Sequence, residues 1–236
     1  MHCVDCKGVA GIVFGGMVSI LLDRLALGRS RADRMEQLRV WAKDWYDRHP
    51  GVAKLPELKV KLVVTEGDQW CELHGVSVKA ANTRAAAPLF RDMCAVHFAS
   101  DSAEDISVTA MATSLCKFYE VLYRAPMFMC DADLADLRVA LGVFGENLMR
   151  LREQARLLRK LRFNVTPKCH RMQHCHNYAG VLNPRWVQNY SEESLMGTTS
   201  KVWEKTMVGR YQKSAQSTVL IKRVLGLLLR FETSSQ

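Results

Sequence analysis

The sequence predicts a mainly α-helical protein, built as a compact multi-helix domain with at most a minor strand element near residues 58–64. Apolar residues recur at three- and four-residue spacing over most of the chain, and few prolines and glycines interrupt them. A single run alternates as a strand does, and one run makes no sheet by itself. The 236 residues, 48% of them hydrophobic, are enough to bury a sizeable core.

The first predicted helix covers residues 9–27 and contains the one long apolar run, residues 8–22. This run is too short to span a bilayer and lacks the basic start of a signal peptide, so we expect a buried core helix. A second helix over residues 31–48 carries an apolar face and ends before His49-Pro50-Gly51. Residues 58–64 then alternate and are the strand candidate.

The middle of the chain predicts two more helices. The first covers residues 79–98, and Pro88 interrupts or kinks it. The second covers residues 103–123, with Ser102 as its N-cap and acidic residues in its first turn.

The last third predicts three helices. The longest covers residues 131–163, and its final turns, from Arg150 onward, are basic and amphipathic. Another helix begins at Pro167, and a final one covers residues 214–230. We therefore divide the chain into a helical region, residues 1–163, and a basic helical region, residues 164–236, packed on it.

The net charge of +9 is concentrated in this last third. Residues 150–236 contain 16 Lys and Arg against 5 Asp and Glu, whereas residues 1–149 contain 17 against 19. Such asymmetry favours a polyanion partner, most often nucleic acid, and the alternative is a set of solubilising side chains. The candidate nucleic-acid-binding residues are Arg159, Lys160, Arg162, Lys168, Arg171, Arg185, Lys201, Lys205 and Arg210.

The eight cysteines favour a reducing, intracellular compartment, because most lie among apolar residues of predicted helices and behave there as buried thiols. Two of them take part in a candidate metal site. His170 and His174, four residues apart, share one helical face and suit a zinc ion, and Cys3 and Cys6 would complete four ligands. The alternative is that the histidines bind backbone and carboxylate partners.

The adjacent carboxylates Glu192 and Glu193 are a second candidate metal site. With an aspartate they would suit Mg²⁺, which prefers oxygen ligands. The alternative is a pair of solvated side chains at a helix start. No phosphate-binding glycine loop and no nucleophile elbow is present, so the sequence shows no complete catalytic motif of these types.

Four short segments, in the same order, resemble motifs of CACTA/Plavaka-type cut-and-paste transposases. Residues 1–9 are similar to that family's "D-x-MH-x-x-x-x-G-V" segment and residues 167–174 to its "PK-x-H-x-x-x-H" segment. Residues 79–84 resemble its "K-x-x-E-x-R" helix, and residues 190–197 its "ER-x-x-G" stretch. The segments from Asn183 onward are also similar to transposon-derived proteins of the dinoflagellate type.

The resemblance implies an RNase H-like DDE fold with a helical insertion, in which three acidic residues hold two metal ions for DNA strand cleavage and transfer. Glu193 takes the place of the terminal acid, and Ser194 stands where the family has Arg. The family's aspartate before "MH" would precede Met1. The resemblance thus predicts a truncated or domesticated nuclear transposase that binds DNA without a complete catalytic site; any remaining activity would be metal-dependent strand transfer or nuclease. The alternative is a helical protein-interaction or structural module, possibly zinc-stabilised, with no nucleic-acid role.

Overall fold

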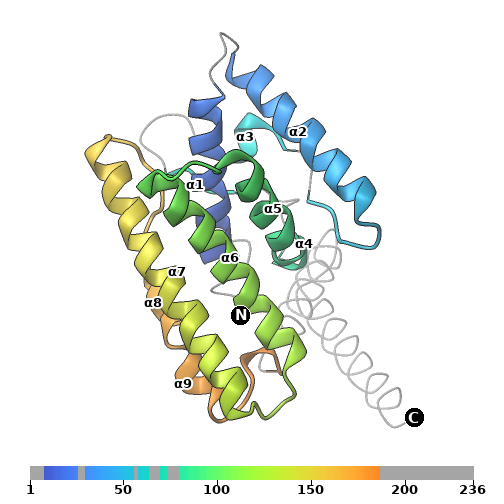
Figure 1. The fold of residues 1–236 in the computed structure, drawn as a ribbon, viewed down its shortest axis with the longest axis vertical. Helices are drawn as coiled ribbons and strands as arrows, with labels where there is room; N and C mark the ends of the chain where they lie inside the picture. The colour runs from blue at the N-terminus through green and yellow to red at the C-terminus, as the bar shows by residue number, and fades with distance from the viewer. Residues whose placement is uncertain (1–7, 26–29, 56–57, 64–69, 74–79, 187–236) are drawn as a thin grey trace, which may run out of the picture. The chain divides into compact units, whose positions relative to one another are not determined.

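The computed structural model describes residues 8–25, 30–55, 58–63, 70–73 and 80–186. The chain divides into two compact units, residues 1–187 and 188–236, and the described residues all belong to the first. Every regular element among them is a helix, which confirms the predicted fold class (Figure 1). The helices are α1 (Val9–Arg24), α2 (Arg31–Arg48), α3 (Val60–Val63), α4 (Ala80–Ala85), α5 (Ala87–His97), α6 (Ala103–Arg124), α7 (Asp131–Leu157), α8 (Pro167–Gln173) and α9 (Cys175–Ala179), followed by the 3-10 turn η1 (Pro184–Trp186).

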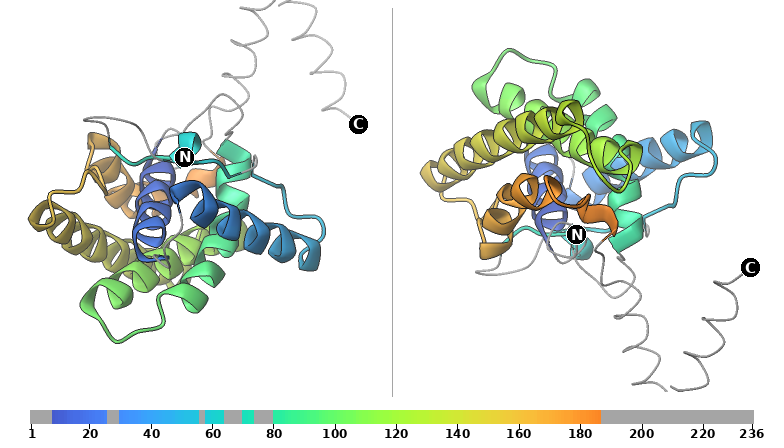
Figure 2. Two further views of the ribbon diagram at one scale, coloured as in Figure 1. Left: turned by 90° about the horizontal axis from the view of Figure 1, so that it is seen from above. Right: turned by 90° about the horizontal axis from the view of Figure 1, so that it is seen from below.

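Helix α1 lies in the middle of the described helices, as the two end-on views of Figure 2 show. Each of its residues from Val9 to Leu22 is buried, which confirms the predicted core helix. The ring of Phe14 stacks on that of Phe90 in α5, with centroids 3.9 Å apart. No helix in the described ranges is both long and apolar enough to cross a bilayer.

Two glycines let neighbouring segments approach α1 closely. A Cβ atom on Gly15 would lie 2.5 Å from the backbone of Glu72, and one on Gly16 would lie 2.5 Å from the ring of Phe163. Residues 70–73 are fixed there by backbone hydrogen bonds, since the Leu73 amide donates to Gly11 at 2.8 Å. Because glycine has no side chain, these two positions leave room for residues 70–73 and for Phe163 to pack directly against the core helix.

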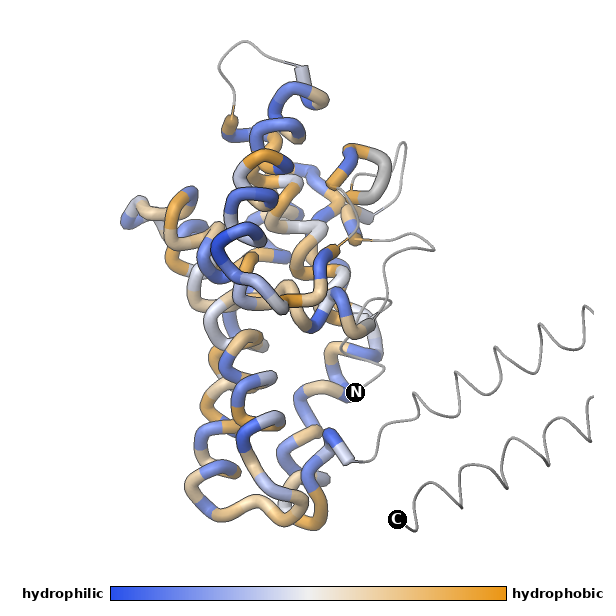
Figure 3. Tube along the Cα trace, turned by 90° about the vertical axis from the view of Figure 1, so that its right-hand side faces the viewer, coloured by the Kyte–Doolittle hydropathy of each residue, from blue (hydrophilic) through white to orange (hydrophobic). Residues whose placement is uncertain are grey.

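Helices α6 and α7 form the longest pair and lie side by side (Figure 1). Ser102 caps α6, because its hydroxyl accepts a hydrogen bond from the amide of Asp105, as the sequence predicts. The loop between the two helices carries apolar colour at the foot of the tube in Figure 3, whereas polar and apolar residues alternate along the helices themselves. The pattern is that of helices with one buried face.

Pro88 does separate two helices, as predicted, because α4 ends at Ala85 and α5 begins at Ala87, with the proline in its first turn. The strand candidate near residues 58–64 is wrong for the residues that the structure describes. Residues 60–63 form one helical turn, and Leu58 and Val63 are buried in the core. The alternating apolar residues are buried one by one from a loop and a helical turn. They do not form a strand, because an isolated strand is not stable without a partner strand.

The predicted helix over residues 131–163 is too long at its C-terminal end. Helix α7 stops at Leu157, and the chain then reverses through Arg159 and Phe163, which have φ values of 53° and 56°. As a result Leu157 and Leu158 are 69% and 61% exposed. The apolar side of the predicted amphipathic end consists of Leu151, Leu157, Leu158 and Leu161, and of these only Leu151 is buried. Residues 164–186 pack back along α7 within the first unit.

Candidate nucleic-acid interface

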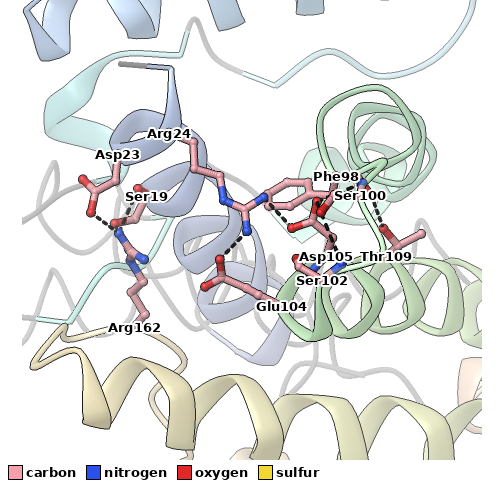
Figure 4. A network of polar contacts seen from close by, with 10 residues as sticks. All are labelled: Ser19, Asp23, Arg24, Phe98, Ser100, Ser102, Glu104, Asp105, Thr109 and Arg162. Carbon is pink, nitrogen blue, oxygen red and sulfur yellow. Dashed lines mark hydrogen bonds and ion pairs between the residues drawn. The ribbon is translucent and has the colours of Figure 1, made fainter. Parts of the chain in front are cut away.

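Arg162, one of the predicted DNA-contacting residues, is buried beside α1 and is only 4% exposed (Figure 4). Its Nε donates to the Ser19 hydroxyl at 3.0 Å, and its Nη2 donates to the Ser19 carbonyl at 3.1 Å and to Asp23. Its Nε and Nη2 groups are directed into the fold, so the side chain ties the segment after α7 to α1. This enclosed position gives no support to the prediction that Arg162 binds nucleic acid.

Arg24, which follows Asp23 in α1, links α1 to α6 in a similar way (Figure 4). Its guanidinium pairs with Glu104 and with the buried carboxylate of Asp105, and it lies 5.0 Å from the ring centroid of Phe98. Asp105 also accepts hydrogen bonds from the hydroxyl and the amide of Ser100. We call the two linked groups around Asp23–Arg162 and Arg24–Asp105 the α1 charge network.

The carboxylates of this network are held in their charged form. Burial raises the pKa of Asp105, but hydrogen bonds from Ser100 and Arg24 outweigh it and lower the pKa overall. Burial likewise raises the pKa of Asp23, and Lys160, Arg162 and Arg31 together lower it below its usual value. Each carboxylate of the network pairs with a cation, so the network links α1 to its neighbours and serves stability.

The remaining predicted cations follow the chain as it returns along α7. Lys160 pairs with Asp23 at 3.1 Å, and Lys168 is half-buried and also has a partner. Arg159 and Arg171 are exposed, and no carboxylate among the described residues pairs with either. These cations come from two stretches of the chain, the turn just after α7 and helix α8.

Arg185, in contrast, belongs to a compact group of cations and rings at the other end of the domain. Its Nη1 donates to the Tyr123 carbonyl at 2.9 Å, and its guanidinium carbon lies 4.3 Å from the ring centroid of Tyr123 and 5.4 Å from that of Trp186. The guanidinium carbon of Arg84, in α4, lies 4.9 Å from the same Tyr123 centroid. We call Arg84, Tyr123, Arg185 and Trp186 the arginine–aromatic cluster.

Asn183 fixes the position of this cluster. It is fully buried, and its side-chain amide donates to the carbonyls of Leu122, Ala125 and Pro126 at the end of α6. Its side-chain oxygen accepts from the Arg185 amide at 3.0 Å. Because one asparagine holds both the end of α6 and the start of η1, the rings of Tyr123 and Trp186 are brought together from residues far apart in sequence.

The cluster presents charge and ring surface to solvent at the same place. Trp186 is 53% exposed and Tyr123 is 37% exposed, and no carboxylate in the described part of the chain pairs with Arg185. A guanidinium stacked on an aromatic ring keeps its in-plane N–H groups available for phosphate oxygens. An exposed indole face accepts a stacked base.

Sequence reasoning identified only part of the cluster. The basic last third of the sequence points to Arg185, whereas Tyr123 falls at the end of a predicted helix and Arg84 in a family-like segment. Only the folded structure brings these residues together, because Tyr123 and Arg185 are 62 residues apart in the sequence.

The predicted metal residues are only partly described. His170 and His174 lie together on an exposed face of α8 and its C-cap, with their Nε2 atoms 3.1 Å apart. The other predicted metal, catalytic and DNA-contacting residues lie outside the described ranges: Cys3, Cys6, Glu192, Glu193, Lys201, Lys205 and Arg210. The Cys₂His₂ zinc site and the acidic Mg²⁺ site stay predictions.

No family model matches the chain, and no match is found among the curated proteins or the solved structures with which it was compared.

Proposed function

We propose that this protein binds nucleic acid, with DNA as the first candidate, through the arginine–aromatic cluster and the exposed cations Arg159 and Arg171. The observation that carries the proposal is the cluster itself. Arg185 has no acidic partner among the described residues and lies against two exposed rings. Cations that follow a phosphate backbone, combined with rings on which bases stack, are the two components of single-strand binding.

The distribution of charge supports the same proposal. Residues 150–186 contain nine Lys and Arg and a single acidic residue, Glu153, which is occupied by Arg156. The acidic residues that neutralise cations of this segment from elsewhere include Asp23, which pairs with Lys160 and Arg162. An excess of positive charge is left in this segment, and such an excess attracts polyanions over a Debye length.

The test is a salt series of DNA-binding titrations followed by fluorescence anisotropy. Arg185→Ala should weaken binding and reduce the slope of log affinity against log salt by about one, because one phosphate contact is lost. Trp186→Ala should cost about 1–3 kcal/mol on single-stranded DNA and leave the slope unchanged, because it removes stacking instead of charge.

Arg150→Ala is the matched control, since Arg150 is exposed but already paired with Glu146. It should bind as the unaltered protein does. Binding that is absent at low salt, or equal in the Arg185 and Arg150 variants, would contradict the proposal.

We also propose that the nucleic-acid binding derives from a transposase, as the four family-like segments imply, and that the chain acts in the nucleus without cutting DNA by itself. The support is the likeness alone, in which Glu193 stands at an acidic position and Ser194 replaces the Arg beside it. Incubation of a nicked-circle substrate with the purified protein and Mg²⁺ or Mn²⁺ should yield no strand cleavage. Cleavage that disappears in Glu193→Ala would contradict the inactive assignment.

A second candidate function, a helical protein-interaction module, is favoured by a groove between α6 and α7. The groove has a volume of about 610 Å³, and exposed apolar side chains of Ile106, Val139 and Val143 line it. This candidate predicts that two copies of the chain associate through the groove. Sedimentation velocity would then show a dimer that Val139→Lys converts to a monomer, with no dependence on DNA.

A further inference from the structure

His170 and His174 are arranged as a pair of nitrogen ligands. Pro167 begins α8, and its fixed φ favours the first helical turn, so the two histidines fall one turn apart on the same face. Their Nε2 atoms are 3.1 Å apart, and their rings are at 87° to one another with centroids 4.4 Å apart. Both side chains are exposed, so an ion in solvent reaches them directly.

The separation of the two nitrogens fits a shared metal ion. Bonds of about 2.0–2.1 Å from a metal to imidazole nitrogen, at angles between those of square and tetrahedral complexes, put two nitrogens about 2.8–3.4 Å apart. Without a metal, the same contact requires one ring to donate a proton to the other.

The surroundings of the pair are consistent with ligation. The side-chain amide nitrogen of Asn177 lies 3.4 Å from Nδ1 of His174. A half-turn of this amide would bring its oxygen to the ring, where it would accept an Nδ1 proton and leave Nε2 free to bind a metal. His176 lies in α9, its Nδ1 contacts the Gln173 carbonyl at 2.8 Å, and no contact in the described part of the chain joins its ring to His170 or His174.

The chemistry of the pair selects the class of ion. In the described part of the chain no third His, Cys, Asp or Glu joins the two histidines to form a larger group. Two neutral imidazoles without a carboxylate suit first-row transition metals such as Ni²⁺, Cu²⁺ and Zn²⁺, and do not suit Mg²⁺ or Ca²⁺.

We propose that His170 and His174 form a chelating site for a divalent transition metal, with the remaining coordination positions open to water. The site uses none of the residues proposed above to bind nucleic acid, although Arg171 lies beside His170 in α8. It needs neither Cys3 nor Cys6.

Isothermal titration of the reduced full-length chain with Ni²⁺ tests the site. One equivalent should bind, and His170→Ala or His174→Ala should each lower the affinity at least tenfold, because a single imidazole loses the chelate. His176→Ala is the matched control and should bind as the unaltered protein does, with helical content by circular dichroism unchanged in all three.

Two results would overturn the proposal. One is an affinity for Ni²⁺ that is the same in His170→Ala and in the unaltered chain. The other is loss of binding in a Cys3→Ser, Cys6→Ser double variant, which would mean that cysteines complete the coordination and that the site is not an open two-nitrogen chelate. Retained binding in the double variant supports the two-histidine site.

Discussion

The charged residues at the end of α1 and those along residues 168–186 differ in whether they pair with residues of opposite charge. In the α1 charge network, Asp23, Arg24, Asp105 and Arg162 contact partners of opposite sign, and two of the four are almost fully buried. Along residues 168–186, in contrast, Arg171 and Arg185 have no acidic partner among the described residues. The difference teaches that a cation's role here depends on what it pairs with and not on its place in a basic stretch.

The close packing around α1 gives the largest expected effect. Gly15→Ala should lower the free energy of unfolding by about 2–3 kcal/mol, because the new Cβ would meet the backbone of Glu72 and Cys71, which cannot move as a side chain can. Gly142→Ala, on the open face of α7 with nothing within 4 Å, should instead raise it by up to about 1 kcal/mol. Urea denaturation of both variants measures the two changes in the free energy of unfolding. Equal changes in the two variants would contradict the prediction.

Removal of Arg162 should have the next largest effect. Arg162→Ala leaves the Ser19 carbonyl without this donor, while Asp23 keeps Lys160 and Arg31, so we expect a loss of about 1–3 kcal/mol. Arg171→Ala should stay within about 0.5 kcal/mol, as for most exposed positions. If the two variants unfold at the same urea concentration, the division between paired and unpaired cations does not hold.

The same division predicts how stability depends on pH. The pKa values of Asp23 and Asp105 are lowered in the folded protein, so the unfolded chain binds protons first as the pH falls. The stability that they contribute is fully present above about pH 4, the ordinary value of a free carboxyl, and is lost as the pH falls through the lower folded values. Thermal unfolding between pH 6 and pH 2 should show this loss, and Asp105→Asn should show less of it.

The smallest change in stability is expected in the arginine–aromatic cluster. Arg185→Ala removes one hydrogen bond to a backbone carbonyl and a stacked contact at the surface, which we expect to cost about 0.5–1 kcal/mol. DNA affinity should nevertheless fall, as described above. A large loss of stability without a change in DNA affinity would place Arg185 with Arg162 as a structural residue.

Helix positions could be predicted from the sequence where local signals are strong. Ser102 and Pro88 mark helix starts through capping and the geometry of proline, and the apolar face of α2 repeats at helical spacing. The end of α7 was missed because Leu158 and Leu161 continue the apolar pattern past the true end. No local feature of the sequence shows that the chain reverses at Arg159.

The candidate nucleic-acid interface was harder to predict, because it also depends on features that the local sequence does not show. A basic segment shows how many cations there are, but burial and pairing decide which are available. Arg162 and Arg185 look alike in the sequence, and only the contacts with Ser19 and Asp23 on one side and with Tyr123 on the other separate them. Asn183, which positions Arg185, carries no sequence signal of that role beyond a turn before Pro184.

The burial of α1 has a consequence for synthesis on the ribosome. Its covering includes Phe163, whose ring lies against Gly16, so the helix is made well before the residues that enclose it. At a translation rate of about 5–20 residues per second, roughly 140 residues take about 7–28 s to add. During that interval an almost wholly apolar helix stands without its final neighbours, so its hydrophobic surface is exposed for as long as the remaining residues take to be made.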